Sequence, residues 1–262
     1  MRVLLVGDIV GKPGRAAFLQ VTNRLKDAGR IDFVIACGEN AASGRGPTLE
    51  IAQSLLNAGA DVVTLGDHAW DSKDMVAGID LEPRIIRPAN FPQGAPGKGW
   101  VRVDTPEGEI TVIQLIGRVF MQPNYDCPFQ EIDRLLDGNL NLGKVVFVDV
   151  HGEASSERMA MGRHLDGRVS AVFGTHTHCQ TSDETVFPNG TAYITDLGMT
   201  GPKDSVLGRE VEPVVKKFLT GVPQRFDVAK GNPTLEGAIV DVDMVTGKAN
   251  SIERVRIALD DL

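Results

Sequence analysis

The chain has 262 residues, of which 42% are hydrophobic and 24% are charged. These proportions are ordinary for a globular protein that buries a large core. The formal net charge is -8, which excludes a broad basic groove for a nucleic-acid polymer, because such a groove needs clustered Lys and Arg facing the phosphates. A small phosphorylated substrate remains compatible with this charge, since bound metal ions can reverse the local field.

The cysteines and the N-terminal segment indicate the compartment. Cys37, Cys127 and Cys179 are an odd number, lie far apart and form no Cys-x-x-Cys pair, so neither a disulfide framework nor a zinc knuckle is predicted. The first eight residues contain too few apolar side chains for a signal-peptide core, and no later run approaches membrane-spanning length. We therefore expect a cytoplasmic protein in a reducing compartment, with no membrane partner.

Strand-like and helix-like segments alternate along the first two thirds of the chain. Short apolar runs predict strands at residues 3–6, 33–36, 62–65, 145–150 and 171–174. Helical patterning is found between them at residues 15–27, 48–57, 129–137 and 156–165. This order predicts βαβ units, and strands that are apolar almost throughout are typical of a sheet covered on both faces.

Two hairpins and a strand-rich C-terminal third follow a different pattern. Residues 100–103 and 110–115 are joined through Pro106-Glu107-Gly108, and Val186 and residues 192–195 through Pro188-Asn189-Gly190. Further strands are expected at residues 225–228, 237–242 and 252–258. No repeat, low-complexity tract or Pro/Ser-rich linker interrupts the chain, so one domain over residues 1–262 is predicted.

Side chains that can bind metals follow the ends of the predicted strands. Asp8, Glu39 and Asp67 follow the first three strands. Four of the five histidines also lie at or just after strand ends: His68, His151, His176 and His178. The carboxyl ends of strands are where α/β sheets bind ligands. These side chains are therefore expected to meet at one edge of a sheet.

Each of these residues alone has an ordinary structural explanation, but together they point to metals. A strand-end Asp commonly caps a turn, and a single His is usually a surface or core residue. Three converging carboxylates would repel one another, whereas divalent cations supply the missing charge. Mixed carboxylate and imidazole ligands suit Mn, Fe, Zn or Co, and their number suits a pair of ions about 3.5–4 Å apart.

The same segments carry a family resemblance. Gly7-Asp8, Gly38-Glu39-Asn40, Gly66-Asp67-His68, Val150-His151 and Gly174-Thr-His-Thr-His178 resemble, in order, the blocks of the calcineurin-like metallophosphoesterases. The longer stretches GDIVGKPGR, GENAASGRG, RPANFP, PGKGW, EASSE, GTHTHCQT and AYITDLGMTGP resemble one branch, the YmdB-like 2′,3′-cyclic-nucleotide phosphodiesterases. The resemblance spans nearly the whole chain and implies an α/β/β/α sandwich, in which two mixed sheets are flanked by helices.

Residue by residue, the resemblance implies a two-metal centre and a proton donor. The implied first-site ligands are Asp8, Glu39, Asn40 and His178, with Glu39 bridging to a second site completed by Asp67, His151 and His176. His68 matches the proton donor of the family. The implied cofactors are two divalent or mixed-valence transition-metal ions, with Fe or Mn favoured over Zn or Co.

The chain departs from the wider pattern at two positions. The superfamily usually has Asp-x-His in the first block, but Val10 stands two residues after Asp8, which is itself typical of the YmdB-like branch. Asp67 stands where the family has Asn. An Asn can donate its NH₂ to a phosphate, whereas an ionised Asp only accepts. We expect metal binding to survive this change, with weaker phosphate binding or a different metal preference.

Other motifs suggest less specific roles. The segment from Gly7 to Pro13 resembles a phosphate loop, but it is one residue too short, and a connecting loop near the metals is the better interpretation. Arg118 is a candidate substrate-binding residue, with an ordinary surface ion pair as the alternative. Cys37 and Cys179 are expected to be small buried hydrophobic residues.

The combined prediction is a metallophosphoesterase acting on a small phosphodiester, with the 2′,3′-cyclic-nucleotide preference implied by the resemblance alone. A hydroxide that bridges the metals would attack phosphorus while His68 protonates the leaving group. One alternative is a nucleotide-sensing regulator that turns over slowly. The other is a metal-dependent amidohydrolase, although its His-x-His pair normally lies on the first strand of a barrel. The sequence leaves open whether the chain forms a homo-oligomer.

Overall fold

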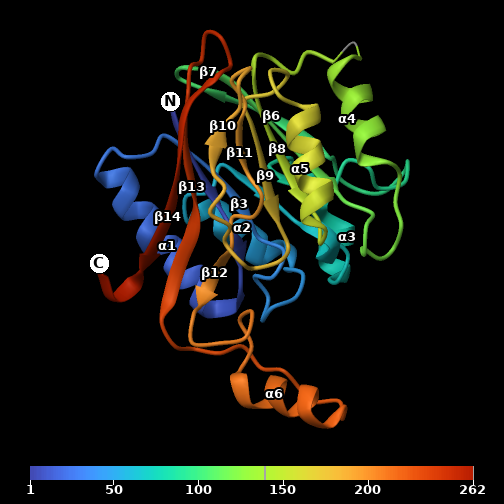
Figure 1. Cartoon of the computed structure of the whole chain (residues 1–262), viewed down its shortest axis with the longest axis vertical. Coiled ribbons are helices and arrows are strands. Elements are labelled where there is room, and N and C mark those ends of the chain that lie inside the picture. The colour runs from blue at the N-terminus through green and yellow to red at the C-terminus, as the bar shows by residue number, and fades with distance from the viewer. Residues whose placement is uncertain (139, 262) are drawn as a thin grey trace.

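The computed structural model describes residues 1–138 and 140–261, and they form two mixed sheets with helices on both outer faces (Figure 1). The first sheet has the strand order β2-β12-β13-β1-β3-β4-β5, with β14 on the other edge of β13. Its strands are β1 (Arg2–Val6), β2 (Asp8–Ile9), β3 (Phe33–Cys37), β4 (Val62–Thr64), β5 (Ile85–Ile86), β12 (Met199–Pro202), β13 (Pro233–Val242) and β14 (Ala249–Ala258). Strands β1, β3, β4 and β5 are parallel, whereas β13 runs antiparallel to β1.

The second sheet has the order β10-β11-β9-β8-β7-β6. Its strands are β6 (Trp100–Thr105), β7 (Gly108–Ile116), β8 (Val145–His151), β9 (Ala171–Thr175), β10 (Thr185–Val186) and β11 (Ala192–Ile194). The four central strands are parallel, and each edge is an antiparallel hairpin. Both hairpins predicted from their turns are therefore confirmed.

Alternating side chains of the strands create the layers. In β1, Val3 and Leu5 face the second sheet, where they share a core with Phe147 and Phe173. Leu4 on the opposite side of β1 packs in a separate core with residues of the helices α1 (Gly11–Asp27) and α2 (Leu49–Asn57). A third core lies between β8 and the helices α4 (Pro128–Leu136) and α5 (Ser155–His164). The order of layers is thus helix, sheet, sheet, helix, which confirms the predicted sandwich.

The helices are α1 (Gly11–Asp27), α2 (Leu49–Asn57), α3 (Lys73–Gly78), α4 (Pro128–Leu136), α5 (Ser155–His164) and α6 (Val211–Thr220), with short 3₁₀ turns at Gly66–His68, Ile79–Leu81 and Leu259–Asp261. Thr48 caps α2 by accepting a hydrogen bond from the Ile51 N–H. None of the helices in the described ranges is long and apolar enough to cross a membrane.

Two local predictions are wrong, and one projecting helix was not predicted. Residues 225–228 form no strand. The guanidinium of Arg209 donates a hydrogen bond to the Phe226 carbonyl, and Val228 forms only an isolated β-bridge with Arg209. The expected loop at Gly11 to Pro13 is instead the first turn of α1, where proline is tolerated. Helix α6, which was not expected, projects from the body (Figure 1) and ends at Gly221 in the left-handed conformation.

Candidate metal centre

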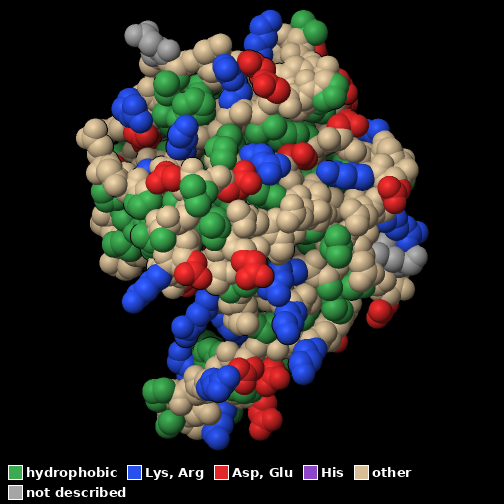
Figure 2. All heavy atoms as spheres, turned by 180° about the vertical axis from the view of Figure 1, so that it is seen from behind, with side chains coloured by type: hydrophobic (Ala, Val, Ile, Leu, Met, Phe, Trp, Pro, Cys, Tyr) green, Lys and Arg blue, Asp and Glu red, His purple; other side chains and the backbone are tan. Residues whose placement is uncertain are grey.

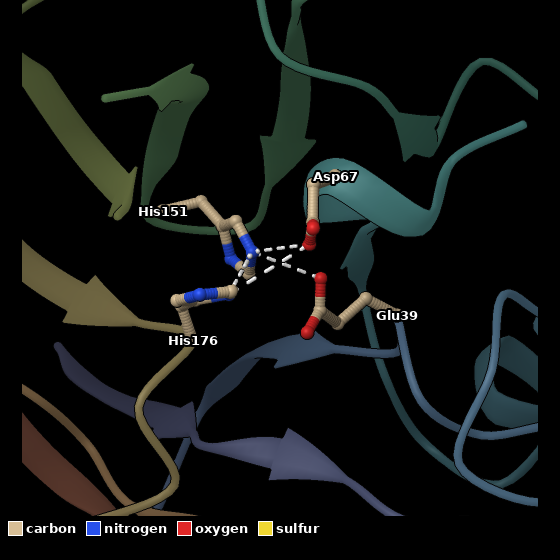
Figure 3. A group of neighbouring side chains, drawn as sticks. All are labelled: Glu39, Asp67, His151 and His176. Atoms are coloured by element: carbon tan, nitrogen blue, oxygen red, sulfur yellow. Dashed lines mark hydrogen bonds and ion pairs between the residues drawn. The ribbon is translucent and has the colours of Figure 1, made fainter. Parts of the chain in front are cut away.

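The predicted ligands converge where the strands of both sheets end. Figure 3 shows Glu39, Asp67, His151 and His176 pointing toward one another, although they come from the segment after β3, a 3₁₀ turn after β4, β8 and the segment after β9. One potential ligand atom from each of these four lies within 4.8 Å of the others. Asp8, Glu39 and His178 form a second such group. Glu39 belongs to both groups, which is the geometry that a bridging carboxylate needs.

A glycine makes room for this convergence. Gly66 precedes Asp67 and has a φ of +58°, a conformation that glycine adopts without steric cost. A Cβ at this position would lie 2.1 Å from Glu39 Oε2 and 2.6 Å from the His151 ring. Any larger residue would therefore displace two candidate ligands at once.

The second-site group is centred on one nitrogen. His151 Nε2 lies 2.9 Å from Asp67 Oδ1, 3.0 Å from Glu39 Oε2 and 3.1 Å from His176 Nδ1. A single N–H cannot serve three partners, and Glu39 Oε2 is buried without a hydrogen-bond partner among the described residues. A buried orphan carboxylate oxygen is costly. A cation at this position would satisfy it, so the residues present fit a metal ion.

The first-site group surrounds Asp8, which is fully buried. Its Oδ2 accepts the His176 N–H at 3.0 Å, and its Oδ1 accepts the Cys37 thiol at 3.1 Å. His178 Nε2 lies 2.6 Å from Asn40 Oδ1, which places these two predicted ligands together. All seven predicted ligands are thus near the two groups, while their role as ligands stays a prediction.

The charges of the cluster strongly perturb one another. Burial raises the pKa of Glu39 well above its usual value, against the opposing charge of His151. Burial would lower the pKa of His151, but Glu39 and Asp67 raise it well above normal. For Asp67, burial is outweighed by the hydrogen bond and charge of His151, which lower its pKa. A proton on His151 thus supplies the positive charge that the carboxylates need, as a metal would.

The imidazole of His176 is held in the opposite state. Burial and the neighbouring His151 lower the pKa of His176 to about 4. The ring is therefore neutral near pH 7, and its Nδ1 is available as a ligand. Its Nε2 lies 3.3 Å from Glu153 Oε2, which fixes the outer edge of the ring.

A buried network, which the sequence analysis did not identify, orients His151. His151 Nδ1 lies 2.9 Å from Thr175 Oγ1, and this hydroxyl donates to Asp149 Oδ1 at 2.8 Å. Gln114 donates to Asp149 Oδ2 at 2.9 Å and accepts the Gly66 N–H at 3.1 Å. Burial raises the pKa of Asp149 to about 6. Asp149 precedes His151 by two residues on one strand, so both side chains lie on the same face of the sheet. This spacing was the sequence signal from which the network could have been predicted.

A second buried carboxylate holds the His-x-His turn. His176 and His178 have φ values of 104° and 62°, which are rare for residues other than glycine. Asp196 accepts the Thr177 N–H at 3.2 Å and its hydroxyl at 2.7 Å, and it is paired with Arg158. These contacts stabilise the strained turn between the two histidines.

His68 lies beside the cluster but belongs to neither ligand group. Its Nδ1 is 2.9 Å from Asp71 Oδ2, and the same oxygen accepts the Gly46 N–H at 3.1 Å. The His68 side chain is 36% exposed. It is therefore anchored at one ring nitrogen and open to solvent, while its role as proton donor stays a prediction.

Of the remaining candidates, Arg118 and Cys179 have different surroundings from those expected. Arg118 is exposed, and its guanidinium donates to Cys127 Sγ at 3.4 Å rather than to a carboxylate. Cys37 is buried as expected, and burial raises the pKa of its thiol, which keeps it a neutral donor. Cys179 is exposed, contrary to expectation, because it lies within the irregular segment after β9.

Comparison with curated proteins identifies relatives over the full length. A protein of Bacillus subtilis (strain 168) named 2′,3′-cyclic-nucleotide 2′-phosphodiesterase is 48% identical over 257 residues, covering 98% of this chain and 97% of the relative. A putative phosphatase/phosphodiesterase of Mycoplasma genitalium is 34% identical over 270 residues, covering 100% of this chain and 94% of the relative.

Solved structures agree with this result. A hypothetical protein from Thermus thermophilus has a TM-score of 0.91 at 42% identity and covers 98% of this chain and 99% of its own. A novel phosphatase from Mycoplasma pneumoniae has a TM-score of 0.92 at 31% identity, covering 98% of this chain and 93% of its own. A putative 5′-nucleotidase from Staphylococcus aureus, with a TM-score of 0.64 at 15% identity, covers 98% of this chain and 54% of its own and shares the fold alone.

The family model described as "YmdB-like protein" matches residues 4–255. This range contains both ligand groups, His68, and the network behind His151. The chain therefore belongs to the YmdB-like family.

Proposed function

We propose that the chain is a metal-dependent phosphodiesterase that hydrolyses small phosphodiesters, with 2′,3′-cyclic nucleotides as the physiological class. The observation that carries this proposal is the pair of ligand groups sharing Glu39. The name of the Bacillus subtilis relative supports the substrate class. The predicted enzyme class, a phosphoesterase, is confirmed by the names of the full-length relatives.

The residues divide between two metal sites. Asp8, Asn40 and His178 would hold the first ion, and Asp67, His151 and His176 the second, with Glu39 between them. When bound, such a metal pair supplies Lewis acidity toward a phosphoryl group and activates water near neutral pH. Iron and manganese are the metals that we propose first, since both accept mixed carboxylate and imidazole ligands.

His68 would act on the leaving group. Its Nδ1 is engaged by Asp71, so its Nε2 is the nitrogen left to face a substrate. Imidazole titrates near neutral pH and is well suited to protonate an alkoxide. Asp71 also accepts the Gly46 N–H, which holds the ring and the loop after Asn40 in one arrangement.

The amidohydrolase alternative has less support. In that superfamily the His-x-His pair lies on the first strand of an eight-fold barrel, whereas here it follows β9 of a two-sheet sandwich. A sensing regulator with slow turnover would share the same metal ligands, so it is distinguished by rate and not by structure.

The test is turnover of bis-p-nitrophenyl phosphate and of a 2′,3′-cyclic nucleotide by protein reconstituted with Mn²⁺ or Fe²⁺. His176→Ala and His178→Ala should each lose a metal and most activity. His164→Ala is the matched control, because His164 pairs with Asp133 on the surface and is outside both ligand groups. Turnover of neither ester by a protein carrying two metals would contradict the proposal.

A further inference from the structure

A cavity of about 410 Å³ lies at the base of the projecting helix α6. It is lined by Ser43, Arg45, Arg209, Gln224, Arg225, Phe226 and Asp227. Residues 43–45 belong to the loop after β3, whereas the others flank α6 on both sides in sequence. Figure 2 shows Lys and Arg side chains gathered around the notch between this helix and the body.

The cavity adjoins the candidate metal centre through shared segments. The Asn40 carbonyl accepts the Gly44 N–H at 2.9 Å, while the Asn40 side chain contacts His178 at 2.6 Å. On the other side, His178 Nδ1 lies 3.3 Å from the carbonyl of Leu207, two residues before Arg209. The walls of the cavity thus belong to the two segments that contact the predicted first-site ligands Asn40 and His178.

The charge of the cavity is opposite to that of the protein. Three of its seven lining residues are arginines and one is an aspartate, in a chain of net charge -8. Asp227 forms an ion pair with Arg225 at 3.1 Å and its charge also acts on Arg209, whereas Arg45 and Arg209 form no ion pair within 4.0 Å among the described residues. The lining thus carries an excess of positive charge, and such an excess in one concave site raises the local concentration of anions.

Arg209 and Arg45 are held differently. Arg209 donates to the carbonyls of Ser43, Gly44 and Phe226, so its guanidinium is fixed in the wall. Burial and then the charge of Arg45 lower the pKa of Arg209, against the charge of Asp227, and both arginines line the same cavity. Arg45 itself is exposed. One cation fixed in the wall and one exposed cation make a site for a phosphate.

The rim adds an aromatic ring and another cation. Phe226 is half-buried in the wall, and Lys217 Nζ lies 5.3 Å from the centre of its ring. Gln224 offers an amide that can both donate and accept. This combination of cations, an amide and an aromatic edge fits a nucleotide better than a free inorganic anion.

We propose that this cavity binds a second phosphate of the nucleotide substrate, a monoester on the 5′ oxygen, while the 2′,3′-cyclic phosphodiester lies at the metal centre. The proposal rests on the proposed function. It names a substrate class that the metal ligands alone do not define, namely 5′-phosphorylated 2′,3′-cyclic nucleotides. Arg45 is the residue that distinguishes this class from the 5′-hydroxyl form.

The experiment compares kcat/KM for one nucleoside 2′,3′-cyclic phosphate with and without a 5′-phosphate, using metal-reconstituted protein. The ratio of the two values should exceed unity for the wild type, and Arg45→Ala should lower it about tenfold, as expected for a lost charge-assisted hydrogen bond. Arg45→Lys should retain part of the ratio. Arg30→Ala is the matched control, since Arg30 is a surface arginine paired with Glu253, and should leave the ratio unchanged.

Two results would overturn the proposal. One is the same ratio in Arg45→Ala as in the wild type, and the other is an equal loss on both substrates, which would mean that Arg45 acts through the metal-binding loop. If the wild type hydrolyses neither nucleotide, the proposed function fails separately. The cavity is then judged by calorimetric binding of a nucleoside 5′-monophosphate, which Arg45→Ala should weaken about tenfold and which must be detectable in the wild type.

Discussion

Thr175→Val tests the network behind His151 with a small change of shape. The substitution replaces a hydroxyl by a methyl group at a fully buried position. It removes the acceptor that lies 2.9 Å from His151 Nδ1 and the donor that lies 2.8 Å from Asp149 Oδ1. The imidazole then loses its orienting partner, while the candidate ligands themselves are unchanged.

We expect the substitution to lower both the metal affinity and the free energy of unfolding. Loss of an outer partner of a ligating histidine typically costs about 10–100-fold in metal affinity, which corresponds to about 1.4–2.8 kcal/mol. Loss of the Thr175 donor also leaves a lone pair of buried Asp149 unsatisfied, at about 1–3 kcal/mol of unfolding free energy. Gln114 still donates to the other Asp149 oxygen at 2.9 Å, so we expect a weakened site and not an unfolded protein.

Calorimetric metal titration and urea unfolding of the metal-free protein measure the two effects separately. Thr22→Val is the matched control, because the Thr22 hydroxyl is buried without a hydrogen-bond partner among the described residues. It should not reduce metal affinity, and its stability should be unchanged or higher. A Thr175→Val protein with the affinity of the wild type would show that the hydroxyl does not orient His151, even if stability falls.

Three further predictions concern the site itself. His68→Ala should keep both metals and slow phosphodiester hydrolysis by about 10²–10⁴. The decrease in rate should be smallest for a substrate with a good leaving group. If the variant loses a metal, His68 is a ligand and not a proton donor. Asp67→Asn should bind inorganic phosphate more tightly, because the site loses one negative charge and gains an NH₂ donor. The measurement is the inhibition constant of phosphate for the variant and for the wild type at equal metal occupancy. In the metal-free protein, His176 should contribute a loss of stability as the pH falls from 6.5 to about 4, because its pKa is 6.5 when unfolded and about 4 when folded, whereas the raised pKa values of Asp149 and Glu39 act in the opposite direction. The His176 contribution is about 3 kcal/mol, so urea unfolding should show His176→Asn gaining stability relative to the wild type as the pH falls through this range.

Much of the candidate site was predictable because topology fixes where strand ends lie. Asp8, Glu39 and Asp67 follow apolar runs in the sequence, and β1, β3 and β4 are parallel neighbours. Their carboxyl ends must therefore meet at one edge. The three candidate histidine ligands were harder, since they lie on or after strands of the other sheet, and only the face-to-face packing of the sheets brings His151 within 3.0 Å of Glu39.

Other features had no local signal in the sequence. Gln114 lies on β7, and its link to Gly66 spans 48 positions, so no pattern within either segment indicates it. The cavity at the base of α6 combines the loop at residues 43–45 with residues 224–227, and residues 225–227 were predicted to be part of a strand. Alternation of Phe226 and Val228 with charged neighbours did suggest a strand, but no sheet edge among the described residues pairs with this segment. Tertiary contacts overrode the local preference.

The two sites have opposite electrostatic requirements, and the fold keeps them separate. The metal centre gathers buried carboxylates whose repulsion is offset by a proton on His151 in the metal-free protein, so metal binding must displace that proton. The adjoining cavity gathers arginines, with Asp227 as the one carboxylate in its lining. If these cations pointed into the metal centre, they would compete with the metals for Asp8 and Glu39. The loop from Asn40 to Gly46 lies between them, and its backbone contacts both Asp71 and Arg209. One short segment can therefore present a ligand to a cation on one side and a cationic side chain to a phosphate on the other.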